Sequence, residues 1–204
     1  MSNPFQNSET KKNLMRAFAG ESQARNRYDF AAGLCQKQGL AVVEAVFRFT
    51  AQQEREHAEI FYQHLQELSG ENIAFDAAYP VDLSSDVAQL LRMAEHNEYE
   101  ERDSVYQSFE ETARQEGFPA VASSFRQIAR IEGLHGQRFG KLAELLEEGK
   151  LFVSDVSCGW MCLNCGHVFQ GKQAPKACPV CGHDQGFFLR LEMAPFAGGL
   201  FQED

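Results

Sequence analysis

A mainly α-helical fold is predicted for this chain: a four-helix bundle with a long crossover between its second and third helices, followed by a small β-rich module with a four-cysteine metal site. Helices are favoured because no proline occurs between Phe5 and Tyr79 and because the long stretches are rich in Ala, Glu, Gln, Arg and Leu. The separate module is indicated by five of the six cysteines, which lie in the last quarter of the chain among Gly, Pro and aromatic residues. The expected domains are residues 1–150 and 151–204.

Glycines, serines and a proline set the ends of four predicted helices of about 30 residues each. Gly39 and Gly70 follow the first two helices as C-terminal stops, and Ser84 or Ser85 can cap the third. The connection at residues 71–83 contains a proline and has no periodicity, so we expect it to be the crossover. The four expected ranges are about Ser8–Lys37, Leu40–Leu68, Ser84–Glu116 and Pro119–Gly149.

The charge of the chain excludes several classes of partner. Nineteen Lys and Arg against 29 Asp and Glu give a net charge of -10, which is the wrong sign for binding nucleic-acid phosphates or anionic lipid. The longest apolar stretches fall far short of the roughly 20 residues that span a bilayer, and the polar start has no signal-peptide core. We therefore expect a cytoplasmic protein with no nucleic-acid or membrane partner, whose cysteines bind metal instead of forming disulfides.

The middle of each predicted helix carries acidic residues or histidine on the stripe that should face the core. Steps of four and three residues run through Phe125 and Phe139 in the fourth helix, and through Phe18, Arg25 and Tyr28 in the first. The second and fourth helices each contain Glu-x-x-His, and the two helix pairs repeat the acidic positions at spacings of 33 and 34 residues. The seven candidate ligands are Glu21, Glu54, His57, Glu98, Glu101, Glu132 and His135.

Metal ions are the expected reason for burying so many carboxylates. An uncompensated buried carboxylate costs several kcal/mol, and converging carboxylates also repel one another. Oxygen-rich ligation with imidazole suits iron or manganese, and ferritin-like di-iron bundles take a Glu from each of two helices and Glu-x-x-His from each of the other two. In the third helix, Glu95 with Glu98 has the same spacing as Glu98 with Glu101; we favour the second pair because Ala94 and Val105 continue its stripe. The remaining histidines, assigned to the surface, are His64, His96, His167 and His183.

The late cysteines form two Cys-x-x-Cys knuckles separated by twelve residues. Two such knuckles can close a tetrahedral site of four thiolates, and this spacing predicts a metal, with structural zinc and a single iron both fitting the ligands. Cys158 has no partner knuckle, and Cys35 lies on the core stripe of the first helix. The predicted ligands are Cys162, Cys165, Cys178 and Cys181. The short strands expected around them are Trp160–Met161, His167–Phe169 and Phe187–Leu191.

Together these motifs resemble those of the rubrerythrin family over nearly all of the 204 residues. The motifs that carry the resemblance are Ala19–Tyr28 (AGESQARNRY), Glu54-Arg55-Glu56-His57, Glu98-Tyr99-Glu100-Glu101, Glu132-Gly133-Leu134-His135 and the paired knuckles. The resemblance favours Glu98 with Glu101, because the family has an aromatic residue after the first acid of its Glu-x-x-Glu pair. Arg102 and His167 depart from the family pattern, in which an aromatic residue and a tyrosine are usual at these positions.

The resemblance implies a ferritin-like domain that binds two irons, followed by a rubredoxin-like domain that binds one. The implied activity is a peroxidase that reduces hydrogen peroxide to water in oxidative-stress defence. Electrons would come from rubredoxin or an NAD(P)H-dependent reductase and pass through the cysteine-bound iron. The chain would form a homodimer or homotetramer in which the donor centre can come from the neighbouring subunit.

The resemblance also implies a role for each candidate ligand. The bridging ligands would be Glu54 and Glu132, and the terminal ones Glu21 and Glu98. His135 would ligate one iron, while the other iron would exchange Glu101 for His57 as the site is reduced. Tyr28 and Tyr106 would donate hydrogen bonds to ligating carboxylates.

Two other interpretations remain open. The first is a ferritin-like ferroxidase or iron-handling protein with a structural zinc tail, and the second is a partner-binding zinc ribbon beside a merely structural bundle. The peroxidase predicts about three irons per chain, two in the bundle and one at the cysteines. An iron-storage protein instead predicts a hollow shell of about two dozen chains.

Overall fold

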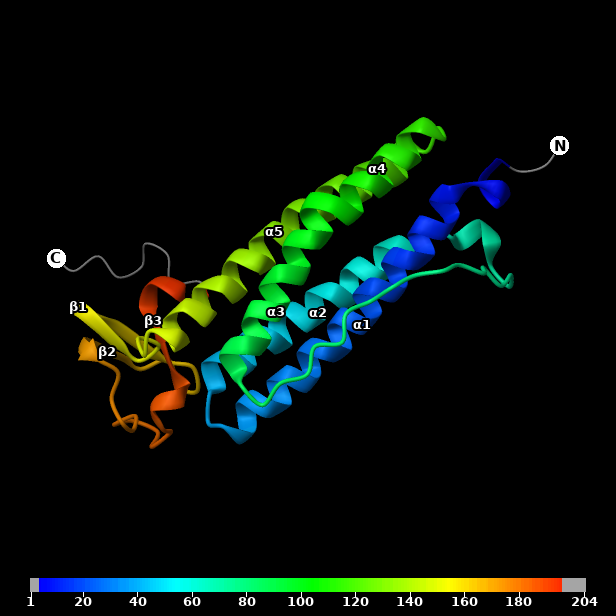
Figure 1. The fold of residues 1–204 in the computed structure, drawn as a ribbon. Coiled ribbons are helices and arrows are strands. Elements are labelled where there is room, and N and C mark those ends of the chain that lie inside the picture. Colours follow the sequence, from blue (N-terminus) through cyan, green and yellow to red (C-terminus); the bar gives the residue numbers. More distant parts are fainter. Residues whose placement is uncertain (1–3, 196–204) are drawn as a thin grey trace.

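The computed structural model describes residues 4–195 and confirms the predicted fold class: a four-helix bundle followed by a small antiparallel sheet. Figure 1 shows α1 beside α2, and α3 with α4 forming one bent rod beside α5. The crossover between α2 and α3 runs along α1, and the sheet lies at the end of the bundle next to the α1–α2 turn. The bundle helices are α1 (Glu9–Lys37), α2 (Ala41–Gln63), α3 (Val87–Glu100), α4 (Tyr106–Gln115) and α5 (Pro119–Glu147).

The helix ends lie close to their predicted positions, with two corrections. Ser8 caps α1 by accepting the backbone N–H of Lys11, as expected for an N-cap serine. The second helix ends at Gln63 and is followed by a short 3-10 turn at Gln66–Leu68, instead of continuing as one helix to Leu68. The cap of α3 is Asp86, not a serine, because its carboxylate accepts the N–H of Ala88.

The third predicted helix is interrupted by a π-helical segment at Glu101–Val105. In the first half of the bundle Tyr28 follows Glu21 by seven residues, whereas Tyr106 follows Glu98 by eight. The wider turn absorbs the extra residue, so both tyrosines still face the core. Val105, which was expected to continue the stripe, is therefore only half-buried, and Tyr106 takes its place.

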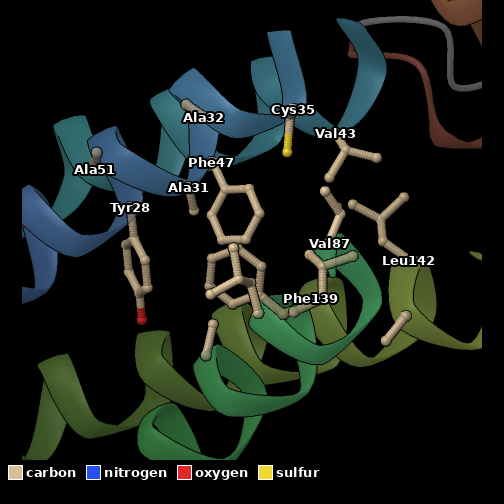
Figure 2. Close-up of a cluster of buried hydrophobic side chains, with 14 of the residues drawn as sticks. Tyr28, Ala31, Ala32, Cys35, Val43, Phe47, Ala51, Val87, Phe139 and Leu142 are labelled. Atoms are coloured by element: carbon tan, nitrogen blue, oxygen red, sulfur yellow. The ribbon is translucent and has the colours of Figure 1, made fainter. Parts of the chain in front are cut away.

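Two apolar clusters lie on either side of the acidic residues and define the core. One surrounds Phe47 and Phe139, whose rings lie 5.1 Å apart between the two helix pairs, with Tyr28 beside them (Figure 2). The other surrounds Phe61 and Phe125, which stack at 4.9 Å. Burying each such aromatic ring contributes about 1.5–3 kcal/mol, so the polar centre is held between two strongly stabilised layers.

The predicted stripe of the first helix was wrong at two positions. Arg25 is exposed and Ala24 faces the core, because the true stripe steps by three residues after Glu21. Phe18 is half-buried and stacks on Tyr62 of α2 on the outer side, at 4.7 Å between ring centroids. Neither Phe18 nor Arg25 is a candidate ligand. Glu21, the candidate ligand on this helix, lies on the buried face as predicted.

Close approach of α3 to α5 depends on glycines in α5. A Cβ at Gly136 would lie 2.7 Å from the ring of Tyr99, and Arg102 occupies the space above Gly133. The guanidinium of Arg102 lies over the ring of Tyr99, 4.5 Å from its centroid. This arginine, which departs from the family pattern, therefore packs on the outer side of the helix pair.

The C-terminal module is a three-stranded antiparallel sheet with strand order β2-β1-β3. Two strands extend beyond the predicted ranges, β1 (Val153–Cys162) and β2 (Val168–Gln173), whereas β3 (Phe188–Arg190) is shorter than predicted. Trp160 is fully buried at its centre. Gly186 packs directly against the carbonyl of Gly39, so that the module is docked at the α1–α2 turn. The predicted boundary at residue 150 falls between the end of α5 and β1 and stays a prediction.

No helix between residues 4 and 195 is both long enough and apolar enough to cross a bilayer.

Glu116, the residue that follows α4, joins the end of α4 to the start of α1 at the end of the bundle away from the sheet. Its carboxylate accepts the backbone N–H groups of Glu9 and Thr10, at 2.9 and 2.8 Å, and the hydroxyl of Thr10 at 2.6 Å. Burial raises the pKa of Glu116, but these hydrogen bonds outweigh it and bring the pKa below its usual 4.5. Its contribution to stability is therefore complete above that pH and lost as the pH falls below it.

Glu116→Ala is expected to lower the free energy of unfolding by about 1–2 kcal/mol at pH 7, because the first backbone N–H groups of α1 lose an acceptor that the N-cap Ser8 does not replace. Urea unfolding followed by circular dichroism measures the loss, and the difference from the wild type should shrink at pH 3.5. Glu111→Ala is the matched control, since Glu111 is exposed and contacts only Arg114 and Gln115 of its own helix. An equal loss of unfolding free energy in both variants would contradict the stabilising role of Glu116.

Candidate metal centres

Six of the seven candidate ligands of the bundle converge in two groups of four buried side chains. Within each group the potential ligand atoms lie within 4.8 Å of one another. Two glutamates belong to both groups, while each group adds one further glutamate and one histidine. The groups are Glu21, Glu54, His57 and Glu132, and Glu54, Glu98, Glu132 and His135. The shared pair is Glu54 and Glu132, the two residues for which the resemblance implies bridging, and that role stays a prediction.

The cluster fits metal ions because its polar atoms are buried without hydrogen-bond partners. A buried polar atom left in this way costs about 1–3 kcal/mol, and a charged one costs more. A cation at each group would compensate all of them, so the residues fit the metals that the fold implies. The atoms without a hydrogen bond are Oε2 of Glu21, Oε1 of Glu54, Oε2 of Glu98, both carboxylate oxygens of Glu132 and Nδ1 of His135, although this nitrogen lies within ion-pair distance, 2.9 Å, of Glu54 and Glu132.

The electrostatics of the cluster show how strongly it needs positive charge. Burial raises the pKa of Glu21 and Glu98 well above the usual range, and neighbouring carboxylates raise it further. Burial lowers the pKa of His135, but the close carboxylates of Glu132 and Glu54 outweigh it and raise that pKa to about 12. For the same reasons the pKa of His57 is about 9. Protons therefore compensate the site where metals do not bind, and metal binding releases them.

A tyrosine of each half of the bundle donates a hydrogen bond to a candidate ligand of the other half, one of the two glutamates predicted to be terminal. The hydroxyl of Tyr28 donates to Glu98, and the hydroxyl of Tyr106 donates to Glu21. Burial raises the pKa of both tyrosines, so both hydroxyls remain donors. The predicted hydrogen bonds from these tyrosines to acidic residues are present, and they fix one oxygen of each terminal carboxylate while leaving the other free.

Glu101 lies outside both groups, although its electrostatics place it near them. Burial, Glu132 and Glu54 raise its pKa to about 8. Glu101 and Tyr106 line a cavity of about 540 Å³ that opens between α1, the crossover and the π-helical segment, with Gly20 on its opposite wall. Glu101 is therefore positioned between this cavity and the metal cluster.

Of the four histidines that were assigned to the surface, one is exposed and three are half-buried. His96 is exposed, whereas His64, His167 and His183 are half-buried. His64 makes a 2.9 Å contact between its Nε2 and the hydroxyl of Ser124 on α5, and burial lowers its pKa. Within residues 4–195 none of these histidines joins a metal-binding group.

The four predicted cysteines of the module form a third candidate site. Their Sγ atoms lie within 4.8 Å of one another, with Cys162 3.7 Å from Cys181 and Cys165 3.6 Å from Cys178. Each knuckle turns at a glycine with positive φ, Gly166 at 77° and Gly182 at 78°. The backbone N–H of His183 lowers the pKa of Cys181 to about 5, which favours the thiolate that a metal requires.

Comparison with known proteins identifies the family. A rubrerythrin model matches residues 12–143, and a model of the rubredoxin-like domain of rubrerythrin matches residues 160–188. A rubrerythrin of Clostridium perfringens is 44% identical over 180 residues, which cover 88% of this chain and 92% of that protein. The chain belongs to the rubrerythrin family.

Further relatives agree with this family assignment. A rubrerythrin of Porphyromonas gingivalis is 42% identical over 188 residues, or 92% of each protein. The structure of nigerythrin in a mixed-valence state matches with a TM-score of 0.60 at 22% identity, covering 93% of this chain and 94% of that chain, and supports the fold. Rubrerythrins are di-iron oxidoreductases whose second domain binds one iron, which supports a role in oxidative-stress defence. The assignment of individual ligands stays a prediction, and the two groups of side chains support it.

Sequence reasoning missed two residues beside the candidate ligands. Gln53 contacts Nε2 of His135, on the side of the ring that faces away from the carboxylates, and Arg138 in turn donates to Gln53. Gln53 directly precedes Glu54, and Arg138 follows His135 by three residues, so both positions are close to a motif. Glutamines and arginines at such positions are common on helix surfaces, and the sequence alone therefore gave no reason to select them.

Proposed function

We propose that this rubrerythrin is a peroxidase that reduces hydrogen peroxide to water, with electrons delivered through the four-cysteine iron centre. The observation that carries the proposal is the pair of ligand groups sharing Glu54 and Glu132, which seats two metal ions side by side. Reduction of one hydrogen peroxide takes up two electrons and two protons and yields two water molecules. Two ferrous ions, when bound, supply one electron each without release of a radical.

The residues of the bundle keep this site in place while its charge changes. Glu54 and Glu132 direct oxygens into both groups, while Tyr28 and Tyr106 hold the terminal carboxylates in fixed orientations. Because the tyrosines satisfy one oxygen of each terminal carboxylate, the other oxygen remains available for ligation. All seven residues Glu21, Glu54, His57, Glu98, Glu101, Glu132 and His135 are assigned to the catalytic site.

Glu101 and His57 are assigned alternating positions. In the described arrangement His57 belongs to the group that contains Glu21, and Glu101 lies outside it. The π-helical turn that carries Glu101 borders the cavity, so this carboxylate can approach the group as His57 leaves. The cavity also gives peroxide a route to the site, because its wall includes Tyr106 and Glu101.

The electron donor is assigned to rubredoxin or an NAD(P)H-dependent reductase, and electrons enter at the cysteine cluster. Cys165 is exposed, so a partner can reach the cysteine cluster without rearrangement of the module. The module is docked at Gly39, and Glu54 lies fifteen residues further along, about 22 Å at the rise of an α-helix. We therefore assign a homodimer or homotetramer in which the cysteine centre of one subunit serves the bundle of its neighbour.

The proposal is tested by adding hydrogen peroxide in small amounts to the anaerobically reduced full-length protein. Peroxide consumption and the visible spectrum are followed together, since the sulfur-bound iron absorbs when oxidised. We expect rapid loss of peroxide followed by oxidation of the cysteine centre, as electrons refill the bundle. Slow loss of peroxide, together with assembly into a shell of about two dozen chains on a sizing column, would instead favour an iron-storage protein.

A further inference from the structure

The ring of His135 makes a polar contact on the side that faces away from the carboxylates. Its Nε2 lies 3.1 Å from Oε1 of Gln53, which is on the neighbouring helix α2. Arg138 donates from NH1 to the same oxygen, at 3.3 Å, and to the hydroxyl of Thr50 at 3.0 Å. The guanidinium is partly buried, and burial lowers its pKa although nearby Glu98 and Glu54 oppose this. Gln53 is thus held from one side by Arg138 and from the other by His135.

Arg138 determines which way the Gln53 amide points. A guanidinium has only donors, so the amide atom that faces it must be the carbonyl oxygen and not the NH₂ group. That oxygen can only accept, so Nε2 of His135 must carry a proton and donate it. Nδ1 of His135 is then the nitrogen that presents a lone pair to a metal. It lies 2.9 Å from Oε1 of Glu54 and 2.9 Å from Oε2 of Glu132.

The second imidazole of the site has no such support. The two helix pairs repeat, so the counterpart of Gln53 before Glu132 is Ile131, and the counterpart of Arg138 three residues after His57 is Ile60. Both are apolar, and neither can accept or orient a proton on a ring nitrogen. In residues 4–195 of the structure, Nε2 of His57 makes no hydrogen bond, while its Nδ1 lies 3.0 Å from Glu54 and Glu132.

We propose that Gln53, oriented by Arg138, is a positioning residue that holds His135 with Nδ1 toward the metal, a support that the second imidazole, His57, lacks. The asymmetry comes from the glutamine and arginine on one side and two isoleucines on the other. The inference deepens the proposed function, and it rests on that function for the metal at His135. It concerns metal binding and therefore does not depend on which oxidant is reduced.

The test compares three full-length variants that change the acceptor or its partner with one control variant. Gln53→Met removes the acceptor at nearly constant size, Gln53→Glu keeps an acceptor beside Arg138, and Arg138→Met removes the group that orients it. Gln52→Met is the matched control, because Gln52 is the exposed neighbour that contacts only Glu56 of its own helix. Circular dichroism verifies the helical content of each variant.

The first readout is the transfer of ferrous iron from the bundle to a chelator. Gln53→Met and Arg138→Met should lose the more labile iron about 10- to 100-fold more readily than the wild type, the usual cost of losing a residue that supports a metal ligand. Gln53→Glu and Gln52→Met should retain iron as the wild type does. The second readout is the ¹⁵N spectrum of histidine-labelled, zinc-loaded protein, in which His135 should show a protonated Nε2 that exchanges faster in Gln53→Met.

The results separate a positioning role from simple packing. If Gln53→Met retains iron and the Nε2 proton as the wild type does, the proposal is wrong. It is also wrong if Gln53→Glu loses iron as Gln53→Met does, because the acceptor would then be irrelevant. A wild-type protein that binds no iron in the bundle would overturn both this inference and the proposed function. If the wild type holds its iron more firmly than Gln53→Met but does not reduce peroxide, the inference is supported and only the proposed function is overturned.

Discussion

Glu54→Ala is expected to leave the bundle without its two irons and to lower peroxide turnover by at least about 100-fold, beyond the usual cost of losing a residue that only supports a ligand. Glu54 belongs to both ligand groups, so its removal takes an oxygen from each metal position at once. It also removes the carboxylate that lies 3.0 Å from Nδ1 of His57 and 2.9 Å from Nδ1 of His135. Iron analysis and peroxide consumption of the anaerobically purified variant measure the two effects.

Glu101→Ala is the matched comparison, since it removes another carboxylate of the same region, one that is half-buried. Glu101 lies outside both groups, and we expect the variant to keep both bundle irons while it reduces peroxide more slowly. A loss of iron equal to that of Glu54→Ala would show that Glu101 is an obligatory ligand. Full activity in Glu101→Ala would contradict its alternation with His57.

Cys162→Ser is expected to stop peroxide turnover driven by reduced rubredoxin, to the level seen without protein, while the bundle still folds and binds its irons. Cys162 is fully buried and belongs to the four-sulfur group, whereas the bundle core consists of other residues. A hydroxyl in place of the thiolate removes one of four ligands of the tetrahedral site. Rubredoxin-coupled turnover and circular dichroism at the helical bands are the measurements.

Cys158→Ser controls for the loss of a cysteine in the same strand. Cys158 lies in β1 opposite Gly171 and outside the four-sulfur group. Its replacement should leave coupled turnover unchanged. Unchanged turnover in Cys162→Ser would show that electrons enter elsewhere, and the proposed role of the module would then be wrong.

The fold could be predicted from the sequence because each level of the pattern pointed to the same answer. Proline-free stretches, glycine stops and the apolar stripes of α2 and α5 agreed with one another, and every predicted core position of α2 is buried. The stripe of α1 was less certain, since alanines at 17, 24, 31 and 32 carry little hydrophobic contrast and Arg25 satisfied the same spacing. The register of a helix rich in small residues depends on its neighbours.

The interruption of the third helix could not be predicted from its local sequence. A π-helical turn changes the step along the helix by one residue, and it is stabilised by the contacts of Tyr106 with Glu21 of a distant helix. The same limit applies to Gln53 and Arg138. Gln53 matters because it contacts one side of the His135 ring, and Arg138 matters because it contacts Gln53; both contacts depend on how α2 packs against α5.

The ligand motifs, by contrast, were readable because acids on an apolar stripe conflict with burial unless a cation compensates them. Glu54, Glu132 and the two histidines gather as their spacing predicts, and so do the four cysteines. Spacing alone cannot show which acidic residues of the third predicted helix belong to a ligand group. Glu98 lies inside a ligand group, Glu101 lies beside it, and Glu95 contacts Arg92 on the outer side.

Buried carboxylates gather in the bundle because two metal ions neutralise them there. Metal analysis of anaerobically purified full-length protein, combined with Mössbauer spectroscopy, tests this explanation most directly. We predict about three irons per chain, two with oxygen and nitrogen ligands and one with four sulfur ligands. A single metal at the cysteines and none in the bundle would contradict the claim.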